Sequence, residues 1–316
     1  MLNIRKCAII GCGFVGASCA FSLVESGLFS ELVLVDANTK KAEGEAMDLS
    51  HGMPFAHPME IYAGSYDDIT DCGLIIITAG ANQKPNETRL DLVHKNVGIL
   101  KTSIMPEITK RSCEGILLVV SNPVDILTYA ALKLSGFPAN RVFGSGTVLD
   151  TARLKYLLGQ HLGVDSRSVH AFIIGEHGDS ELAVWSSANV SGVDLDHFCE
   201  LCGNCDDRET MQSLYEEVRD SAYKIIERKG ATYYGIAMAV RRIAECILRN
   251  EHSILPVSSL IQGHYGLHNI CMGVPCIVGS TGVEKVLDIR LNEEEQRNLL
   301  ASAESLQKVL STLDLS

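Results

Sequence analysis

The sequence lacks any apolar run long enough to cross a membrane, because no stretch of 18 or more apolar residues occurs in its 316 residues. It also lacks a basic excess, since 27 Lys and Arg face 39 Asp and Glu and the formal net charge is -12. An acidic surface disfavours nucleic acid and anionic membranes as partners. We therefore expect neither partner, and any anionic ligand must be held by local cations and backbone N–H groups.

An export signal and a disulfide framework are also missing from the pattern. The N-terminus enters a strand pattern at residues 6–11, without the charged, apolar and cleavage-site segments of a signal. The eleven cysteines are an odd number scattered through apolar runs. Reduced thiols explain that distribution better than disulfides, so we expect a cytoplasmic protein.

A glycine-rich turn follows the first strand pattern and opens an apolar helix pattern. It reads Gly11-Cys12-Gly13-Phe14-Val15-Gly16. In such a turn the first glycine permits the bend, the second admits a pyrophosphate and the third packs the helix on the strand. Asp36 ends the next strand pattern, where a carboxylate accepts from ribose hydroxyls and repels a 2′-phosphate. The pattern predicts NAD binding, and the alternative is a turn that only packs a helix on a sheet.

Strand and helix patterns then alternate as far as residue 143, with one long helix expected over residues 90–108. Apolar strands separated by helices predict a parallel sheet covered on both faces, with ligands beyond its carboxyl ends. The polar segment 81–89 is expected to be a mobile loop over those ends, or else a solvated connection. Asn122-Pro123 could form a cis peptide, although most X-Pro bonds are trans.

After residue 145 the pattern changes, with a helix at residues 149–162, another from about 210 to 249 that breaks near 229–230, and two strands at 254–261 and 269–278. Asn292 and Glu295 form a capping-box start for a last helix. The sequence thus predicts a Rossmann-type doubly wound parallel sheet followed by a mixed α+β domain. We place the dinucleotide-binding domain at residues 1–144 and the substrate domain at residues 145–316.

A histidine between two glycines follows a run expected to be one buried strand, residues 169–174. The segment reads Ile174-Gly175-Glu176-His177-Gly178-Asp179. A strand end gives this side chain a stiff support, and histidine titrates near neutral pH, with an unperturbed pKa of about 6.5. Asp150 and Arg153 lie three residues apart and so share one helix face. The alternatives are a polar turn residue and a helix-surface ion pair.

Five motifs in order along nearly the whole chain resemble the lactate/malate dehydrogenase family. They are Gly11 to Gly16 with Asp36, Gln83 to Arg89, Ser121 to Asp125, Leu149 to Arg153, and Ile174 to Asp179. The resemblance implies that His177 is the proton donor and acceptor, that Asp150 is its partner and that Arg153 clamps the substrate carboxylate. It also implies a polarising role for Arg89, a carbonyl contact for Asn122, a pocket position for Thr232 and a reading of the substrate side chain by Gln83. The implied cofactor contacts are Gly11, Gly13, Phe14, Val15, Gly16, Asp36, Ala79, Gly80, Ser121, Asn122 and Ser145.

The activity that the resemblance implies is hydride transfer between NADH and pyruvate, giving L-lactate. Malate or a branched 2-hydroxy acid stays open as the substrate, since the catalytic residues would be the same. Malate enzymes of the family place arginine where this chain has Gln83, which favours pyruvate. A dinucleotide-sensing protein without catalysis is the alternative from another class, and the intact set of His177, Asp150, Arg153 and Arg89 argues against it.

The resemblance also implies a homotetramer and a possible effector. Many bacterial relatives bind fructose 1,6-bisphosphate between subunits through an arginine and a histidine, and Lys155 and His170 stand at those two positions. Separately, Cys199, Cys202 and Cys205 beside His197 have a spacing that could suit a metal, but no fourth ligand is obvious. We expect free surface thiols there and no metal.

Overall fold

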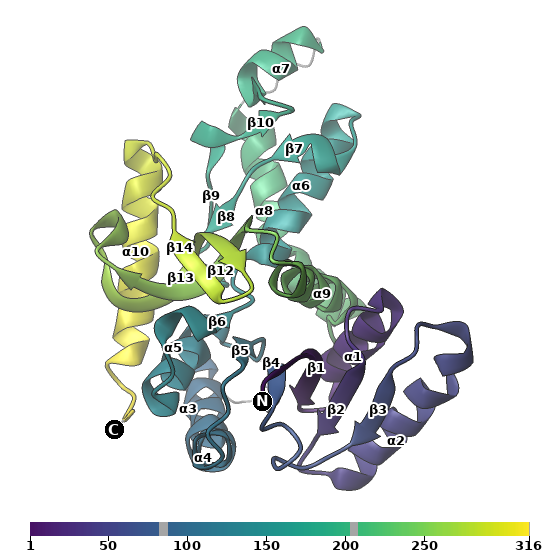
Figure 1. Ribbon diagram of the computed structural model, residues 1–316. Coiled ribbons are helices and arrows are strands. Elements are labelled where there is room, and N and C mark those ends of the chain that lie inside the picture. The colour runs from purple at the N-terminus through teal and green to yellow at the C-terminus, as the bar shows by residue number, and fades with distance from the viewer. Residues whose placement is uncertain (82–87, 203–207, 316) are drawn as a thin grey trace.

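The computed structural model describes residues 1–81, 88–202 and 208–315 (Figure 1). The first half alternates strands and helices, as the apolar periodicity predicts. Its strands are β1 (Asn3–Ile10), β2 (Glu31–Val35), β3 (Glu60–Ala63), β4 (Cys72–Ile77), β5 (Ile116–Val119) and β6 (Val142–Gly144). Its helices are α1 (Phe14–Ser26), α2 (Thr39–His51), α3 (Arg89–Ile99), α4 (Met105–Lys110) and α5 (Val124–Ser135).

The second half is mixed. Its helices are α6 (Val148–Leu162), α7 (Leu195–Leu201), α8 (Arg208–Lys229), α9 (Tyr234–Arg249) and α10 (Glu293–Leu310). Its strands are β7 (Val169–His170), β8 (Ile173–Ile174), β9 (Leu182–Ala183), β10 (Asn189–Val190), β11 (Val193–Asp194), β12 (Ser253–Gln262), β13 (His268–Gly279) and β14 (Gly282–Val286). Short 3-10 turns lie at Met53–Phe55, Ala139–Arg141, Ser166–Ser168, Trp185–Ser187 and His264–Gly266. Among the described residues, every helix is too short or too polar to cross a bilayer.

The six strands of the first half form the parallel sheet that the sequence predicts, in the order β3-β2-β1-β4-β5-β6. In the centre of this sheet Ile9 of β1 pairs with Leu34 of β2 on one side and Ile76 of β4 on the other. These side chains are almost wholly buried. Because the strand order reverses between β1 and β4, the carboxyl ends of those two strands flank the crevice where such sheets bind ligands.

The same sheet continues into the second half of the chain. Ser258 of β12 pairs with Gly144 of β6, and β12, β13 and β14 extend the sheet antiparallel to a total of nine strands. The main hydrophobic core therefore contains residues from both halves. Sequence patterns give the strands of the second half, but they do not indicate that these strands complete the first sheet.

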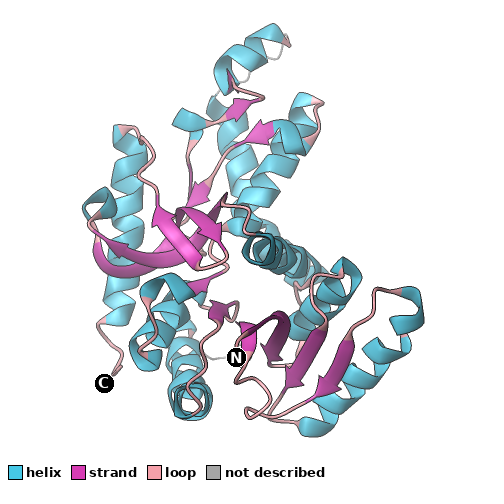
Figure 2. Cartoon of the chain, viewed as in Figure 1, coloured by secondary structure: helices cyan, strands magenta, loops and turns pink. Residues whose placement is uncertain are grey.

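Helices cover both faces of the sheet (Figure 2). α9 packs against α1 and β13, whereas α5 and α10 pack together and against β13. A second, smaller core stands apart from the sheet, in the region of α6, α7 and α8 at the top of Figure 1. It is built from apolar side chains such as Leu158, Val190 and Val218.

The helix expected over residues 90–108 is not one α-helix. α3 ends at Ile99, residues Leu100–Ile104 form a π-helical segment, and α4 begins at Met105. Pro106 carries no amide N–H, so the Thr102 carbonyl loses its α-helical donor and the turn before the proline widens. The break expected near Lys229 is confirmed, because α8 ends there and α9 begins at Tyr234.

The single buried strand expected over residues 169–174 is also wrong. β7 pairs with β10, β8 pairs with β9, and His170 of β7 is exposed. The chain changes partners between the two strands because it passes from the second core toward the main sheet. There the backbone of Gly175 exchanges two hydrogen bonds with Gly273, each 2.8 Å long.

Candidate functional site

His177 is held by a carboxylate on a neighbouring helix. Its Nδ1 lies 2.6 Å from Oδ2 of Asp150, and Nη1 of Arg153 donates to Oδ1 of the same carboxylate over 2.6 Å. Asp150 is 1% exposed and sits in the first turn of α6, where the helix dipole favours a negative charge. The three-residue spacing of Asp150 and Arg153 thus brings their side chains into contact. Because Asp150 contacts Nδ1 of His177, the other ring nitrogen, Nε2, is left for another partner.

A second carboxylate fixes the backbone of the same turn. The His177 amide donates to Oδ2 of Asp125 over 2.7 Å, and the Ser258 hydroxyl donates to the other oxygen over 2.6 Å. Asp125 lies in α5, just beyond the carboxyl end of β5, and Ser258 lies in β12. The continuous sheet therefore positions the histidine from both halves of the chain.

The electrostatics favour a charged imidazole. Burial opposes the charge of His177, but Asp150 outweighs it and the pKa of His177 rises to about 9. Burial likewise opposes the charge of Asp150, whereas His177 and Arg153 hold its pKa below the usual range. The two groups therefore form an imidazolium–carboxylate pair at neutral pH. Burial raises the pKa of Asp125 to about 6 despite its hydrogen bonds to Ser258 and His177.

Side chains from α8 and α10 hold the residues around His177. The Tyr223 hydroxyl donates to Asp179 over 2.8 Å, and the Tyr215 hydroxyl donates to the backbone carbonyl of Glu181. From α10, the Ser302 hydroxyl accepts the Glu176 amide over 2.9 Å. The turn that carries His177 is thus fixed by three helices, α5, α8 and α10.

The glycine-rich turn has the shape that a dinucleotide needs. Gly11 has a φ of 103°, and a Cβ on Gly16 would lie 1.9 Å from the Gly11 carbonyl oxygen, so both positions require glycine. A Cβ on Gly13 would meet nothing within 4 Å among the described residues, which leaves room for a phosphate. Gly13 also precedes α1 without a side-chain cap, so amide groups of the first turn stay available to an anion.

Asp36 lies just past β2, beside that turn. Its carboxylate accepts the Cys12 amide over 2.6 Å and the Asn38 amide over 2.8 Å, one on each oxygen. Each carboxylate oxygen has a further lone pair, so ribose hydroxyls could still be bound. The arrangement fits the predicted NAD contacts, in which the turn would hold the pyrophosphate and Asp36 would hold the ribose.

The structure brings the predicted strand ends together. The Ser121 hydroxyl donates to the Ala79 carbonyl over 2.7 Å, and a Cβ on Gly11 would lie 2.5 Å from the Ala79 amide nitrogen. The Ser145 amide donates to the Val119 carbonyl of β5 over 2.9 Å. The residues predicted to contact the cofactor at the ends of β1, β4, β5 and β6 therefore line one edge of the sheet.

Other predicted residues are placed less completely. Gln83 and the loop expected to be mobile lie outside the described residues, and Arg89 is the first residue of α3. Asn122 is exposed and forms a cis peptide with Pro123. Thr232 is partly buried between α8 and α9, and within the described chain no hydrogen bond joins it to His177.

Sequence reasoning missed three residues. Asp125 stands inside the motif Ser121 to Asp125 but received no role, because its partner His177 lies 52 residues further along the chain. Asn96 is 4% exposed and joins two strand ends, since its side chain accepts the Ala81 amide and donates to the Asn122 carbonyl, both over 2.8 Å. Glu181 lies four residues after His177 and is buried, and an isolated glutamate gives no pattern that would reveal it.

Asp150, His177 and Glu181 each place one possible ligand atom within 4.8 Å of the others. Both Asp150 oxygens are already occupied, and the nearby guanidinium of Arg153 opposes a cation, so we assign no metal to this set. The expectation of surface thiols near His197 is wrong for Cys199, which is 4% exposed and packs in the second core. Cys202 is exposed, and Cys205 lies outside the described residues.

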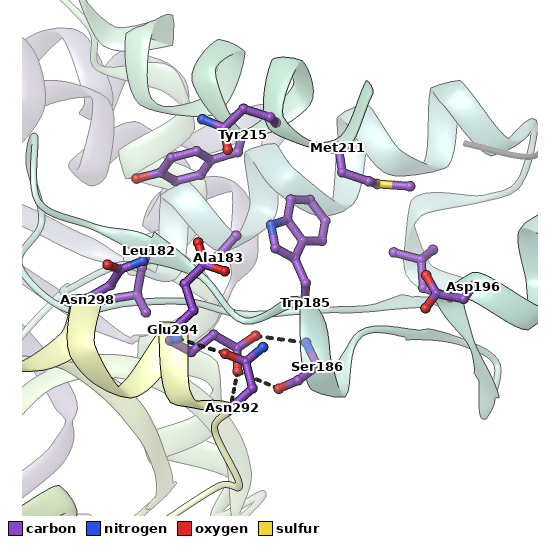
Figure 3. Close-up of a pocket in the computed structure, with 13 residues that line it drawn as sticks. Leu182, Ala183, Trp185, Ser186, Asp196, Met211, Tyr215, Asn292, Glu294 and Asn298 are labelled. Carbon is purple, nitrogen blue, oxygen red and sulfur yellow. Dashed lines mark hydrogen bonds between the residues drawn. The ribbon is translucent and has the colours of Figure 1, made fainter. Parts of the chain in front are cut away.

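A cavity of about 440 Å³ is lined by residues of β9, α7, α8, α10 and the 3-10 turn Trp185–Ser187 (Figure 3). Trp185, Met211 and Tyr215 line it, and so do Ser186 and Glu295, which are joined by a hydrogen bond from the Ser186 hydroxyl over 2.5 Å. His177, Asp150 and Arg153 are not among its lining residues. The cavity is therefore separate from the His177 set.

A six-stranded parallel sheet with a glycine-rich switch point and a histidine held by a buried carboxylate is typical of NAD-dependent dehydrogenases. Family models agree with that class. The lactate/malate dehydrogenase NAD binding domain matches residues 5–144, and the lactate/malate dehydrogenase alpha/beta C-terminal domain matches residues 147–314. The chain belongs to the lactate/malate dehydrogenase family.

Individual relatives are similar along almost their full lengths. L-lactate dehydrogenase of Acetivibrio thermocellus is 55% identical over 99% of this chain and 98% of its own. L-lactate dehydrogenase 1 of Clostridium acetobutylicum is 53% identical over 99% and 100%. The crystal structure of the minor L-lactate dehydrogenase of Enterococcus mundtii in its ligands-bound form matches with a TM-score of 0.96 at 44% identity, over 99% of both chains.

Proposed function

We propose that this chain is an NAD-dependent L-lactate dehydrogenase, which interconverts pyruvate and L-lactate. The observation that carries the proposal is the contact between the partly buried His177 and the buried Asp150, with Arg153 on the same carboxylate. The named relatives support the choice of pyruvate and lactate as substrates. In this proposal residues 1–144 bind the dinucleotide and residues 145–316 supply the proton and the carboxylate clamp.

His177 supplies the proton in this mechanism. Its Nδ1 is held by Asp150, so the proton that moves is the one on Nε2, which passes to the substrate carbonyl oxygen during reduction. A pKa of about 9 keeps the imidazole protonated at neutral pH, and Asp150 stabilises that charge. Bound NADH supplies the hydride for the carbonyl carbon. In the reverse direction neutral His177 takes the proton from the hydroxyl group of lactate.

Arg153 binds the substrate carboxylate. One guanidinium nitrogen contacts Asp150, and the planar fork has further N–H donors that match a carboxylate. In this proposal Arg89, Asn122 and Thr232 complete the pocket around the reacting carbonyl. Gln83 then faces the methyl end of pyruvate, where a neutral amide leaves no buried charge unpaired.

An assay of NADH oxidation with pyruvate, oxaloacetate and 2-ketoisocaproate tests the function. We expect a strong preference for pyruvate, and a reversal toward oxaloacetate in Gln83→Arg because the new cation pairs with a second carboxylate. A wild type that prefers oxaloacetate or 2-ketoisocaproate would move the assignment within the family. Inactivity with all three, together with retained NADH binding, would favour the sensing alternative.

We propose that fructose 1,6-bisphosphate is an effector, with Lys155 and His170 among its ligands. His170 is exposed on β7, which packs against α6, where Lys155 is half-buried and burial lowers its pKa. A lysine keeps the charge of an arginine but not its fork, so we expect weak activation, and weaker activation at pH 8 than at pH 6. Pyruvate saturation with and without the bisphosphate at pH 6 and pH 8 tests this. Superimposable curves at both pH values would exclude the effector site.

We propose a homotetramer, supported by apolar side chains that α1 and α9 leave exposed. Phe21 is 59% exposed and Met238 is 70% exposed, on two helices that pack together. A second copy of the chain would cover them. We expect Phe21→Glu with Met238→Glu to lower the mass measured by analytical ultracentrifugation. The control is Leu201→Glu, on a residue that is 66% exposed in α7, and an unchanged mass in the double variant would contradict this face as an interface.

We also propose a cytoplasmic location. No disulfide joins the ten cysteines in the described part of the chain, and most of them are buried as thiols. Such thiols suit a reducing compartment.

A further inference from the structure

Glu181 is a buried acid beside the proposed proton donor. It is 5% exposed, and its Oε1 has no hydrogen-bond partner among the described residues. Its backbone is well fixed, because its amide donates to the Gly178 carbonyl over 3.1 Å and its carbonyl accepts the Tyr215 hydroxyl. A buried polar oxygen without a partner is costly, so its presence here calls for a reason other than stability.

Three acid or base groups meet at this point. One side-chain atom each of Glu181, Asp150 and His177 lie within 4.8 Å of one another, and the last two are already hydrogen-bonded to each other. The charged and titratable groups facing Glu181 come from two helices and the turn itself. They are Asp150 and Arg153 of α6, Tyr215 and Arg219 of α8, and His177.

Glu295 offers a comparison, because it is equally buried, at 5% exposed. Its carboxylate accepts the Ser186 amide, the Ser186 hydroxyl and the Asn292 amide, over 2.9, 2.5 and 2.9 Å. Those three donors give both oxygens of the Glu295 carboxylate a hydrogen-bond partner. Glu181 has no comparable donors at Oε1 and faces the charges of the His177 set.

We propose that Glu181 is a positioning residue for His177, a third acid whose protonation state sets how firmly the His177–Asp150 pair holds its proton. The proposal rests on the proposed function, since it gives His177 the role of proton donor. Glu181 acts through His177 and does not itself meet the substrate.

The charge balance of the set explains the effect. Burial, with a contribution from Asp150, raises the pKa of Glu181 to about 8, so the acid is neutral at pH 7. The imidazolium, Asp150 and Arg153 then leave one net positive charge, which a substrate carboxylate neutralises. Above about pH 8 ionised Glu181 cancels that charge, which weakens pyruvate binding. The same negative charge makes His177 hold its proton to a higher pH, because Glu181 raises the pKa of His177.

The decisive experiment is an NMR titration of the His177 imidazole in the full-length, substrate-free enzyme, with the signal assigned from His177→Ala. Glu181→Gln keeps the shape and removes the charge, so we expect the titration midpoint to fall by about 1 pH unit. Glu181→Met, an apolar variant of similar size, should lower it in the same direction. At pH 7 both variants should keep pyruvate KM within about twofold, because Glu181 is already neutral there.

Steady-state kinetics give a second readout. At saturating pyruvate, the loss of kcat on raising the pH should begin at a lower pH in Glu181→Gln than in wild type, because His177 of the variant loses its proton at a lower pH. Glu295→Gln is the matched control, because it removes an equally buried carboxylate away from His177. It should leave the His177 midpoint in place.

An unchanged midpoint in both Glu181 variants would overturn the proposal, as would an equal fall in Glu295→Gln. If neither Glu181 variant folds at pH 7, the carboxyl is a structural group and the proposal is also wrong. The NMR midpoint does not depend on turnover. A wild type that fails to reduce pyruvate would therefore refute the proposed function, while the titration would still decide the role of Glu181.

Discussion

The glycine-rich turn and the His177 turn both face the proposed ligand site, but they are built from different materials. Residues 11–16 shape their site with backbone, because Gly11 and Gly16 exclude side chains and Gly13 leaves space. The His177 turn is surrounded by three buried acids, which are Asp125 of α5, Asp150 of α6 and Glu181 from the end of the turn itself. The shape of the glycine-rich turn is set by six consecutive residues. The charge around His177 comes mainly from carboxylates that lie far from it in the sequence.

This difference teaches which changes should damage each site. A backbone site fails when an atom is added where no space exists, and a neutral methyl group is sufficient. A carboxylate site tolerates changes of shape better than changes of protonation. The predictions below test that contrast, beginning with the largest expected effect.

Replacing His177 with alanine should have the largest effect. We expect turnover of pyruvate to fall by about 10²- to 10⁴-fold, because the positioned acid is lost. NADH binding, followed by fluorescence, should stay nearly normal, since the glycine turn is intact. His197→Ala, at an exposed histidine of α7, is the control and should keep wild-type turnover. Near-normal turnover in His177→Ala would remove this residue from the mechanism.

Two alanine variants of the glycine turn should separate folding from binding. In Gly16→Ala the new methyl group clashes with the Gly11 carbonyl, and we expect a loss of about 1–3 kcal/mol of stability together with NADH binding. Gly13→Ala meets nothing within 4 Å and has a φ of -71°, so it should fold normally and lose only NADH affinity. Thermal unfolding and NADH titration measure the two effects. Unchanged affinity in Gly13→Ala would mean that no phosphate approaches there.

Asp125→Asn should change the pH dependence of stability. Burial raises the pKa of Asp125 to about 6, above its unfolded value, so folding favours the protonated form. Its stabilising contribution is present below about pH 4 and is lost as the pH rises to about 6, a difference of about 3 kcal/mol. Urea unfolding at about pH 4.5 and pH 7 should show wild type losing stability relative to the variant. If the unfolding free energies of wild type and variant change equally between the two pH values, the pKa of Asp125 is not raised by folding.

Cofactor choice should give the smallest effect. Wild type should prefer NADH to NADPH, because Asp36 repels a 2′-phosphate, and Asp36→Asn should narrow the preference by about tenfold, or about 1.4 kcal/mol. The amide can keep one of the two backbone contacts that the carboxylate makes. The ratio of kcat/KM for the two cofactors measures this. Equal efficiency of wild type with both would contradict the role of Asp36.

Most of the fold could be predicted from the sequence because its signals are local. Alternating apolar runs give the parallel strands, and Asn292 with Glu295 gives the start of α10, where both capping contacts are present. The split of the 90–108 helix follows from Pro106, a signal that was available but was outweighed by the helical periodicity. The pairing of β6 with β12 could not be predicted, because the sequence of a short apolar strand does not indicate which strand it will pair with.

The candidate site divides in the same way. Asp150 and Arg153 lie three residues apart on one helix, so their contact could be predicted from spacing. The hydrogen bond from the His177 backbone to Asp125 joins residues that are far apart in sequence, and the sequence gives no sign that they meet. The role proposed for Glu181 is harder still to predict, because it depends on the lack of a hydrogen-bond donor near Oε1 among the described residues. Such an absence exists only in the folded chain.

The sheet that runs unbroken through both halves has a consequence for biosynthesis. When a ribosome has released the chain as far as Gly144, the parallel sheet can assemble, but the outer side of β6 has no neighbour. Its partner, Ser258 of β12, is made only after the helices and short strands of the second core. Until then the nascent protein carries a bare strand edge, which is the kind of surface that recruits strands from other chains. We therefore expect the outer edge of β6 to be a place where misassembly can begin during synthesis, at the junction that later holds His177 in place.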